Sequence, residues 1–267
     1  MIIDFHTHAF PDTIAEKAIT KLSKAGNIQP YSNGTIDGLL ESMEKNGVDL
    51  SINLPVATNK DHTRDMNKFW KLINDRCEKI ISFAAAHPDA PDIEGDIYYA
   101  KYNKYLGIKI HPDYQGTFID DEKYVKLLSE AKKNGLITVV HAGYDVAFPN
   151  EEIKCTPKRV LNLLDKLGGY DKLVLAHLGG NELFSQVYTE LAGENVYLDT
   201  SYVLPYTSRE NFEKLLSKHG EDKILFASDS PWQDQGNMIN IIKGYSLKDV
   251  AERKIFSENA KKLLNIR

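Results

Sequence analysis

Eight short apolar runs rich in β-branched residues recur along this chain of 267 residues, and stretches with helical spacing separate them. Strands buried on both faces of a parallel sheet have near-continuous apolar sequences, whereas half-exposed strands alternate polar and apolar residues. The recurrence therefore predicts a parallel sheet built from repeated βα units. The eight runs span residues 2–6, 48–54, 80–86, 106–111, 137–141, 173–177, 196–200 and 224–229.

The intervening stretches carry apolar residues at positions i, i+3, i+4 and i+7, the spacing of an amphipathic helix with one buried stripe. An Asn-Gly pair at 134–135 and a Gly-Gly pair at 168–169 precede the fifth and sixth runs. Glycine readily adopts the left-handed backbone that ends many helices, so both pairs predict helix ends. The clearest apolar stripes are Met66, Phe69, Trp70 and Ile73; Tyr124, Leu127, Leu128 and Ala131; and Val160, Leu163, Leu164 and Leu167.

Length narrows the choice among folds built from βα units. A (β/α)8 TIM barrel usually needs about 250 residues, and the chain has 267. A doubly wound open sheet is the alternative, but eight strands with a helix after each favour closure. With no Pro/Gly/Ser-rich linker to divide it, residues 1–267 are expected to form a single α/β TIM-barrel domain.

Composition excludes several functional classes. The 42% apolar and 27% charged residues are typical of a soluble globular protein. A net charge of −5 without long charged runs gives no indication of nucleic-acid or membrane binding, so a small-molecule partner is expected. Cys77 and Cys155 lack CxxC spacing, which argues against a disulfide framework or a thiolate zinc site. No signal peptide or long apolar span is recognisable, so a cytoplasmic location is expected.

Polar residues capable of chemistry stand at the ends of the apolar runs. Active sites of β/α barrels lie at the carboxyl ends of the strands. Period-two alternation predicts that Asp4, His6 and His8 share one side of the first strand, so that two imidazoles can reach one ion. The residues that end later runs are Lys109 and His111, His141, His177, and Asp229.

Each of these histidines taken alone is more often a core or loop residue than a ligand. Their joint position beside a carboxylate on the last strand, which neighbours the first strand in a closed barrel, predicts a metal site. Imidazole nitrogen and carboxylate oxygen suit Zn²⁺ and also Mn²⁺ or Fe²⁺. A divalent metal, with Zn²⁺ as the first choice, is therefore the expected cofactor.

These motifs resemble those of the amidohydrolase superfamily: HxH after the first run, single histidines after the fifth and sixth, and Ser-Asp at 228–229. Three blocks are similar to its amidohydrolase-related (amidohydrolase 2) branch, which includes proteins like aminocarboxymuconate-semialdehyde decarboxylase. They are GIKIHP at 107–112, LAHLGG at 175–180 and FASDSP at 226–231. The final NAKKLL at 259–264 is similar to the last helix of that branch.

The resemblance implies that His6, His8, His141 and Asp229 ligate one metal ion and that His177 lies close without ligating. Asp229 would accept a proton from metal-activated water, and His177 would polarise the substrate or donate a proton. Three roles are possible for Lys109. It could bridge a second ion if carboxylated, bind a substrate carboxylate, or pair with a neighbouring acid.

Two reactions fit this set of residues. The first is hydrolysis of an amide, ester or lactone bond in a small polar molecule by metal-activated water. The alternative is metal-dependent non-oxidative decarboxylation of a small aromatic or unsaturated acid, for which Lys109, Arg64 and Arg159 are the candidate anchors. A barrel that holds metal but has lost catalysis is a third reading. The family resemblance also suggests a homodimer.

Further residues are assigned by position alone. His111 lies on the same strand face as Lys109 and is expected to contact the substrate. Asp4 is expected to support the site by holding a ligand imidazole or the backbone. Candidate lining residues are Tyr114, Asn53, Asn59 and Trp232, while His62, His87 and His219 are expected to lie outside the site.

Overall fold

The computed structural model describes residues 1–266, in which parallel strands alternate with helices. All eight predicted runs contain strand, and the third divides into two short strands around Phe83. The strands are β1 Ile3–Thr7, β2 Leu50–Asn53, β3 Ile80–Ser82, β4 Ala84–Ala85, β5 Gly107–Ile110, β6 Ile137–Val140, β7 Leu173–Leu175, β8 Tyr197–Asp199 and β9 Ile224–Leu225.

The strands follow one another in chain order around the molecule. β1, β2 and β3 form one parallel group, and β4 to β9 form another. The backbone N–H of Phe5 donates to the carbonyl of Phe226 at 2.9 Å, and that of Asp229 donates to His6 at 2.8 Å. These bonds join the segment after β9 to β1, and the predicted TIM barrel is confirmed.

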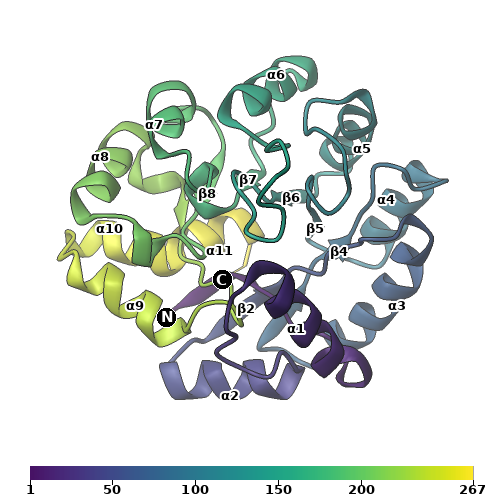
Figure 1. Cartoon of the computed structure of the whole chain (residues 1–267), viewed down its shortest axis with the longest axis horizontal. Coiled ribbons are helices and arrows are strands. Elements are labelled where there is room, and N and C mark those ends of the chain that lie inside the picture. Colours follow the sequence, from purple (N-terminus) through teal and green to yellow (C-terminus); the bar gives the residue numbers. More distant parts are fainter. Residues whose placement is uncertain (267) are drawn as a thin grey trace.

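Helices surround the strands in Figure 1, with α1 drawn in front of them. The three predicted apolar stripes lie on α3, α5 and α6 and face the core. α6 shows how the sequence sets the limits of a helix, because Thr156 caps its start and Gly168 (φ 60°) ends it. The helices are α1 Asp12–Gly26, α2 Ile36–Asn46, α3 Thr63–Asn74, α4 Ile93–Tyr102, α5 Glu122–Lys133, α6 Pro157–Leu167, α7 Phe184–Gln186, α8 Arg209–His219, α9 Gln235–Gly244, α10 Asp249–Arg253 and α11 Asn259–Leu264.

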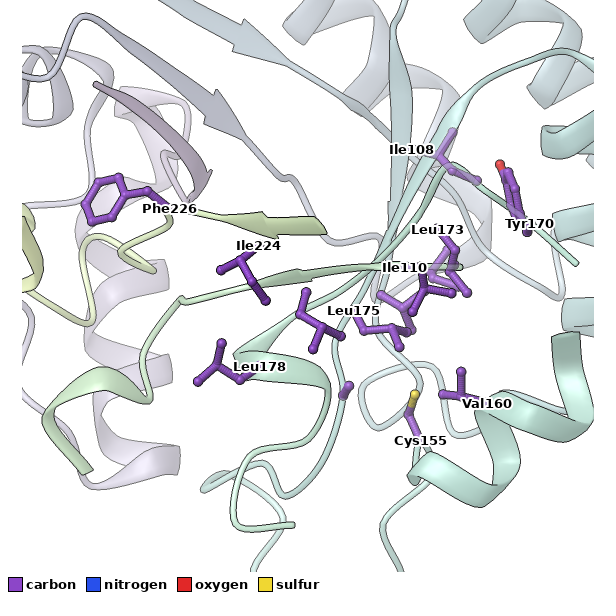
Figure 2. Close-up of a cluster of buried hydrophobic side chains, with 14 of the residues drawn as sticks. Ile108, Ile110, Cys155, Val160, Tyr170, Leu173, Leu175, Leu178, Ile224 and Phe226 are labelled. Carbon is purple, nitrogen blue, oxygen red and sulfur yellow. The ribbon is translucent and has the colours of Figure 1, made fainter. Parts of the chain in front are cut away.

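The core has two layers. The outer one packs strand residues against helices, and Figure 2 shows part of it, where Ile110 and Leu175 lie near Val160 of α6. The inner layer brings together apolar residues of strands from all sides of the ring, among them Phe5 and Val139, with residues of α11. Apolar packing thus fills the interior between α11 and the polar carboxyl ends of the strands.

A bulge in β1 corrects one sequence-based expectation. Ile3 and Phe5 both pack in the inner layer, so Asp4 points outward, where Gln235 of α9 donates to its carboxylate at 2.8 Å. The pairing with β2 shifts between Asp4 and Thr7, which inserts one extra residue into β1. Simple alternation was therefore wrong for Asp4, and the bulge turns His6 inward to the side that His8 also faces.

Cys77 and Cys155 are both free, and Cys155 is fully buried beside α6. Within residues 1–266, every helix is too short or too polar to span a bilayer.

Candidate metal centre

Three predicted ligands converge at the mouth of the barrel. Nε2 of His6 lies 3.2 Å from Nε2 of His8, and an Asp229 carboxylate oxygen lies 3.4 Å from the first and 3.2 Å from the second. Ligand bonds of about 2.0–2.2 Å in tetrahedral geometry place ligand atoms about 3.3–3.6 Å apart. The spacing of His6, His8 and Asp229 therefore matches a site for one divalent ion.

The electrostatics of this cluster also suit a cation. Burial, with a further contribution from Lys109, holds the pKa of His6 well below its usual value, so its imidazole stays neutral. Burial opposes ionisation of Asp229, but the neighbouring His8 and His6 lower the pKa of its carboxyl below the usual value. Neutral imidazole and carboxylate are the forms that ligate metals.

The outer nitrogens of both imidazoles are held by the protein. Nδ1 of His6 lies 2.9 Å from Oδ2 of Asp199, and Nδ1 of His8 lies 2.9 Å from the carbonyl of Leu54. Both partners are acceptors, so each Nδ1 carries the hydrogen and each Nε2 presents a lone pair to the cluster. Asp199 is the last residue of β8 but was not among the predicted site residues.

Asp4 supports the cluster from behind, as expected. Its carboxylate accepts hydrogen bonds from the backbone N–H groups of His6 at 3.3 Å and of Ser228 at 2.8 Å. Ser228 directly precedes Asp229, so one buried carboxylate ties the two ligand-bearing segments together. Burial raises the pKa of Asp4 to about 6 despite these hydrogen bonds.

His177 lies beside the cluster, and its ring centre is 5.5 Å from that of His6. Nδ1 of His177 bonds the carbonyl of Ser201 at 3.0 Å, and its Nε2 lies 2.9 Å from Nδ1 of His141. The role of His177, close to the metal without ligating it, stays a prediction. His141 contacts His177 and not the three clustered side chains, and its assignment as their fourth ligand stays a prediction.

Two predicted site residues have left-handed backbones. Asp229 has φ 71° and His177 has φ 59°, a region that costs a residue other than glycine about 1–2 kcal/mol. The backbone N–H of Asp229 is fixed by the His6 carbonyl, and that of His177 by the Asp199 carboxylate at 3.1 Å. The surrounding hydrogen bonds thus hold both side chains at the barrel mouth.

Lys109 is fully buried, and its Nζ lies 3.1 Å from Nε2 of His6. No acid of residues 1–266 forms an ion pair with it, so the structural pairing considered from the sequence is absent from this part of the chain. Burial lowers the pKa of Lys109 to about 8, although nearby carboxylates such as Asp199 oppose the shift.

A second cluster lies on the other side of His177. The ring of His111 stacks on that of His141 at 4.0 Å, and Nε2 of His111 lies 3.1 Å from an oxygen of Asp145. Asp113 is also close, with one carboxylate oxygen 3.8 Å from Nε2 of His141. Asp113 and Asp145 lie in loops with no periodic pattern to mark them, and the only sequence signal is their spacing of two and four residues from a histidine.

Both clusters open into one cavity of about 840 Å³. The predicted residues Tyr114 and Trp232 line it, as does His62, contrary to expectation. Apolar side chains of α1 and α3 form the outer wall, and the lysines of the lining are Lys21 and Lys109. His87 and His219 make local hydrogen bonds elsewhere, as predicted.

Four other candidates have structural roles. Asn53 bonds Ala9 and Ser82 inside the fold, and Asn59 caps a turn before α3. Arg64 pairs with Asp96, and Arg159 pairs with Asp120 and Glu152. Neither arginine belongs to the cavity lining, so these two candidate substrate anchors were wrong.

The sequence model of the family described as Amidohydrolase matches residues 3–266. The chain belongs to the amidohydrolase family. A comparison with curated proteins gives no match. The family assignment agrees with the resemblance seen in the sequence and with the metal-ligand cluster at the barrel mouth.

Solved amidohydrolase-like structures share the whole fold at low identity. The 2,6-dihydroxybenzoate decarboxylase from Rhizobium aligns with a TM-score of 0.73 and 18% identity over 99% of this chain and 98% of its own. A dihydroxybenzoic acid decarboxylase from Polaromonas sp. JS666, with bound manganese, gives 0.71 and 15% over 99% and 96%. An amidohydrolase from Burkholderia multivorans, with bound zinc, gives 0.71 and 14% over 100% of each chain.

The family match establishes a metal-dependent enzyme of the amidohydrolase superfamily. The similar structures from Polaromonas and Burkholderia hold manganese and zinc respectively. In this chain, His6, His8 and Asp229 could hold a divalent ion, and the choice of zinc stays a prediction.

Proposed function

We propose that this amidohydrolase decarboxylates a small aromatic or unsaturated carboxylic acid without an oxidant. The observation that carries the proposal is the cavity, in which the imidazole and carboxylate groups at the barrel mouth meet an apolar wall. Phe10, Phe69 and Trp70 belong to that lining and suit a planar ring. Decarboxylases of dihydroxybenzoic acids share this fold.

In this proposal His6, His8 and Asp229 hold the divalent metal, which when bound supplies Lewis acidity toward substrate oxygens. The bond between the ring carbon and the carboxylate breaks, CO2 leaves, and the electron pair stays on the carbon. That carbon then takes a proton. His177 and Asp229 both line the cavity and are the candidates to deliver it.

Charge in the cavity suits an anionic substrate. Two lysines line the cavity, Lys109 at its inner part and Lys21 at its outer part. Either ammonium group can attract a carboxylate. His111 also lines the cavity and remains a proposed substrate contact, as the sequence suggested. The apolar wall would exclude water from the ring carbon during the reaction.

Hydrolysis of an ester, lactone or amide is the second candidate, and one observation favours it. Although burial opposes its ionisation, the neighbouring His8 and His6 lower the pKa of Asp229, so the carboxylate is ionised at neutral pH. An ionised carboxylate is ready to accept a proton from attacking water, whereas it must first gain a proton before it can protonate carbon.

A substrate screen with two readouts tests the proposal. The manganese-loaded enzyme is incubated with hydroxybenzoic acids and, separately, with aryl esters, lactones and amides, while CO2 and released acid are measured. We expect CO2 from at least one hydroxybenzoate, deuterium on the product ring in heavy water, and loss of at least 100-fold in Asp229→Asn. Acid release from the esters or lactones with no CO2 from any acid would overturn decarboxylation in favour of hydrolysis.

A further inference from the structure

The cavity at the barrel mouth is much larger than a hydroxybenzoate. Its volume is about 840 Å³. At about 30 Å³ for each water-sized group, this space holds about 28 non-hydrogen atoms. A hydroxybenzoate has about ten and fills roughly a third of the cavity. The cavity therefore leaves room for a substituent larger than the ring itself.

One apolar wall of this extra space comes from α1, which lies in front of the strands in Figure 1. The buried residues of α1 are Ala15 and Ile19. Ile14, Ala18 and Leu22 form a separate face at positions i, i+4 and i+8, and all three line the cavity. Ile14 is 49% exposed. An apolar face left partly exposed beside a cavity is typical of a ligand-binding groove.

A second apolar wall comes from α3. Met66, Phe69 and Trp70 belong to the apolar stripe predicted from the sequence, and all three also line the cavity. Trp70 is buried, whereas Met66 and Phe69 are half-buried, so part of the stripe is left to contact a ligand. A flexible methionine beside aromatic rings adapts well to apolar groups of different shapes. The two helices thus provide an apolar surface on which a ligand can lie.

Polar residues are arranged differently in the inner and outer parts of the cavity. His6, His8 and Asp229 of the inner part lie at the barrel mouth. An acid that reacts there places its other end beside α1 and α3, where removal of apolar groups from water favours binding. Polar residues of the outer lining are exposed and can keep their charges and hydroxyls in water. They are Thr13, Lys21, Thr58, His62 and Asp65.

We propose that the substrate is an amphipathic acid, with its carboxylate at the inner end and an apolar extension of about six or more carbon atoms between α1 and α3. This inference rests on the proposed function for the position of the carboxylate and adds the substituent that distinguishes the substrate. Each buried methylene strengthens binding about fourfold. Ala18 determines specificity, because its small side chain leaves space that a larger one would fill.

Calorimetric titration of the manganese-loaded chain with two probes tests the extension. The probes are 2-nitrophenol and 4-hexyl-2-nitrophenol, in which a nitro group replaces the carboxylate so that no CO2 can be released. We expect the hexyl probe to bind at least 10-fold more tightly than 2-nitrophenol. Ala18→Trp should reduce this ratio to less than threefold. Thr20→Trp, which adds the same side chain to an exposed position of α1 outside the lining, is the matched control and should keep the ratio.

The outcomes separate this inference from the proposed function. Equal affinities for the two probes, no binding of the hexyl probe, or an unchanged ratio in a folded Ala18→Trp protein would overturn the apolar extension, with circular dichroism to verify folding. If the substrate screen yields CO2 in that case, decarboxylation stands. A tighter hexyl probe whose advantage is lost only in Ala18→Trp supports the extension, and absence of CO2 from every acid would then overturn decarboxylation alone.

Discussion

At the scale of single residues, Asp199 organises both sides of the candidate site. One of its oxygens holds Nδ1 of His6 at 2.9 Å, and the other accepts from the backbone of His177 at 3.1 Å. Asp199 therefore fixes the tautomer of a proposed ligand and the position of a proposed proton donor at the same time.

Replacement of Asp199 by Asn should weaken metal binding about 10- to 100-fold, because the amide no longer secures the hydrogen on Nδ1 of His6. Titration of the stripped chain with Mn²⁺ measures the effect. Asp165→Asn, on the exposed side of α6, is the control and should bind as the unaltered chain does. An unchanged affinity in Asp199→Asn would show that this carboxylate does not position the ligand.

His219 makes a separate prediction about stability and pH. Burial lowers its pKa from 6.5 to about 4, while its Nε2 bonds the carbonyl of Val196. The unfolded chain then binds a proton at this histidine at a higher pH than the folded chain does. The contribution of His219 to the free energy of unfolding is therefore full above pH 6.5 and is lost as the pH falls toward 4. The loss amounts to about 3 kcal/mol.

Urea unfolding of His219→Gln at several pH values tests this linkage. Between pH 6.5 and 4, the free energy of unfolding of the variant should fall less steeply than that of the unaltered chain. Parallel curves for the two proteins would contradict the role given to His219.

Single residues also show how far the sequence could define the site. His6, His8 and Asp229 could be predicted because each follows an apolar run whose end reaches the barrel mouth. Asp113 and Asp145 could not, because their positions depend on loop conformations that no periodic pattern encodes. Arg64 was wrongly considered because its acid partner, Asp96, lies on another helix.

At the scale of elements, the loop after β6 carries His141 and Asp145 and depends on one glycine. Gly143 has φ 87° and pairs with Asn181 as a bridge between the segments after β6 and β7. A Cβ at this position would lie 2.1 Å from the backbone nitrogen of Asn181. Only a residue without a side chain permits this close approach.

Gly143→Ala should therefore lower the free energy of unfolding by about 1–3 kcal/mol and should loosen the second cluster. Gly168→Ala is the matched control, since Gly168 also has a positive φ but a Cβ there would meet nothing within 4 Å. Gly168→Ala should lower the free energy of unfolding by about 1 kcal/mol, because only the positive φ disfavours alanine there. Chemical denaturation measures the free energy of unfolding of both variants. An equal decrease in both would show that the close approach of Asn181 to Gly143 does not require glycine.

Strand positions were accessible from the sequence, whereas local departures from regularity were not. Each apolar run yields strand because a strand buried on both faces needs continuous apolar sequence. The sequence pattern does not indicate the bulge in β1, because the spacing of Asp4, His6 and His8 is also the spacing of a regular strand. The third run divides at Phe83, within residues that are uniformly apolar or small.

At the scale of the whole molecule, closure of the strand ring is what unites residues far apart in the sequence. The segment after β9 bonds back to β1 and places Asp229 against His6 and His8. The first strand and the segment after the last strand are thus joined at the proposed metal. An ion bound there links the first strand to the last.

Metal removal should consequently destabilise the entire domain. At a free Mn²⁺ concentration 100 times the dissociation constant, binding adds about 2.7 kcal/mol to the free energy of unfolding. For a chain of this size, each kcal/mol raises Tm by about 2–4 °C. Calorimetry of loaded and stripped protein should show this rise, and His8→Ala should show less of it. Equal rises in both proteins would place the stabilising ion elsewhere.

Binding of one divalent ion by His6, His8 and Asp229 is tested most directly by anomalous diffraction from crystals of the manganese-loaded protein. We expect an anomalous peak bonded to Nε2 of His6, Nε2 of His8 and a carboxylate oxygen of Asp229. Full metal loading in solution with no peak among these three side chains would contradict it.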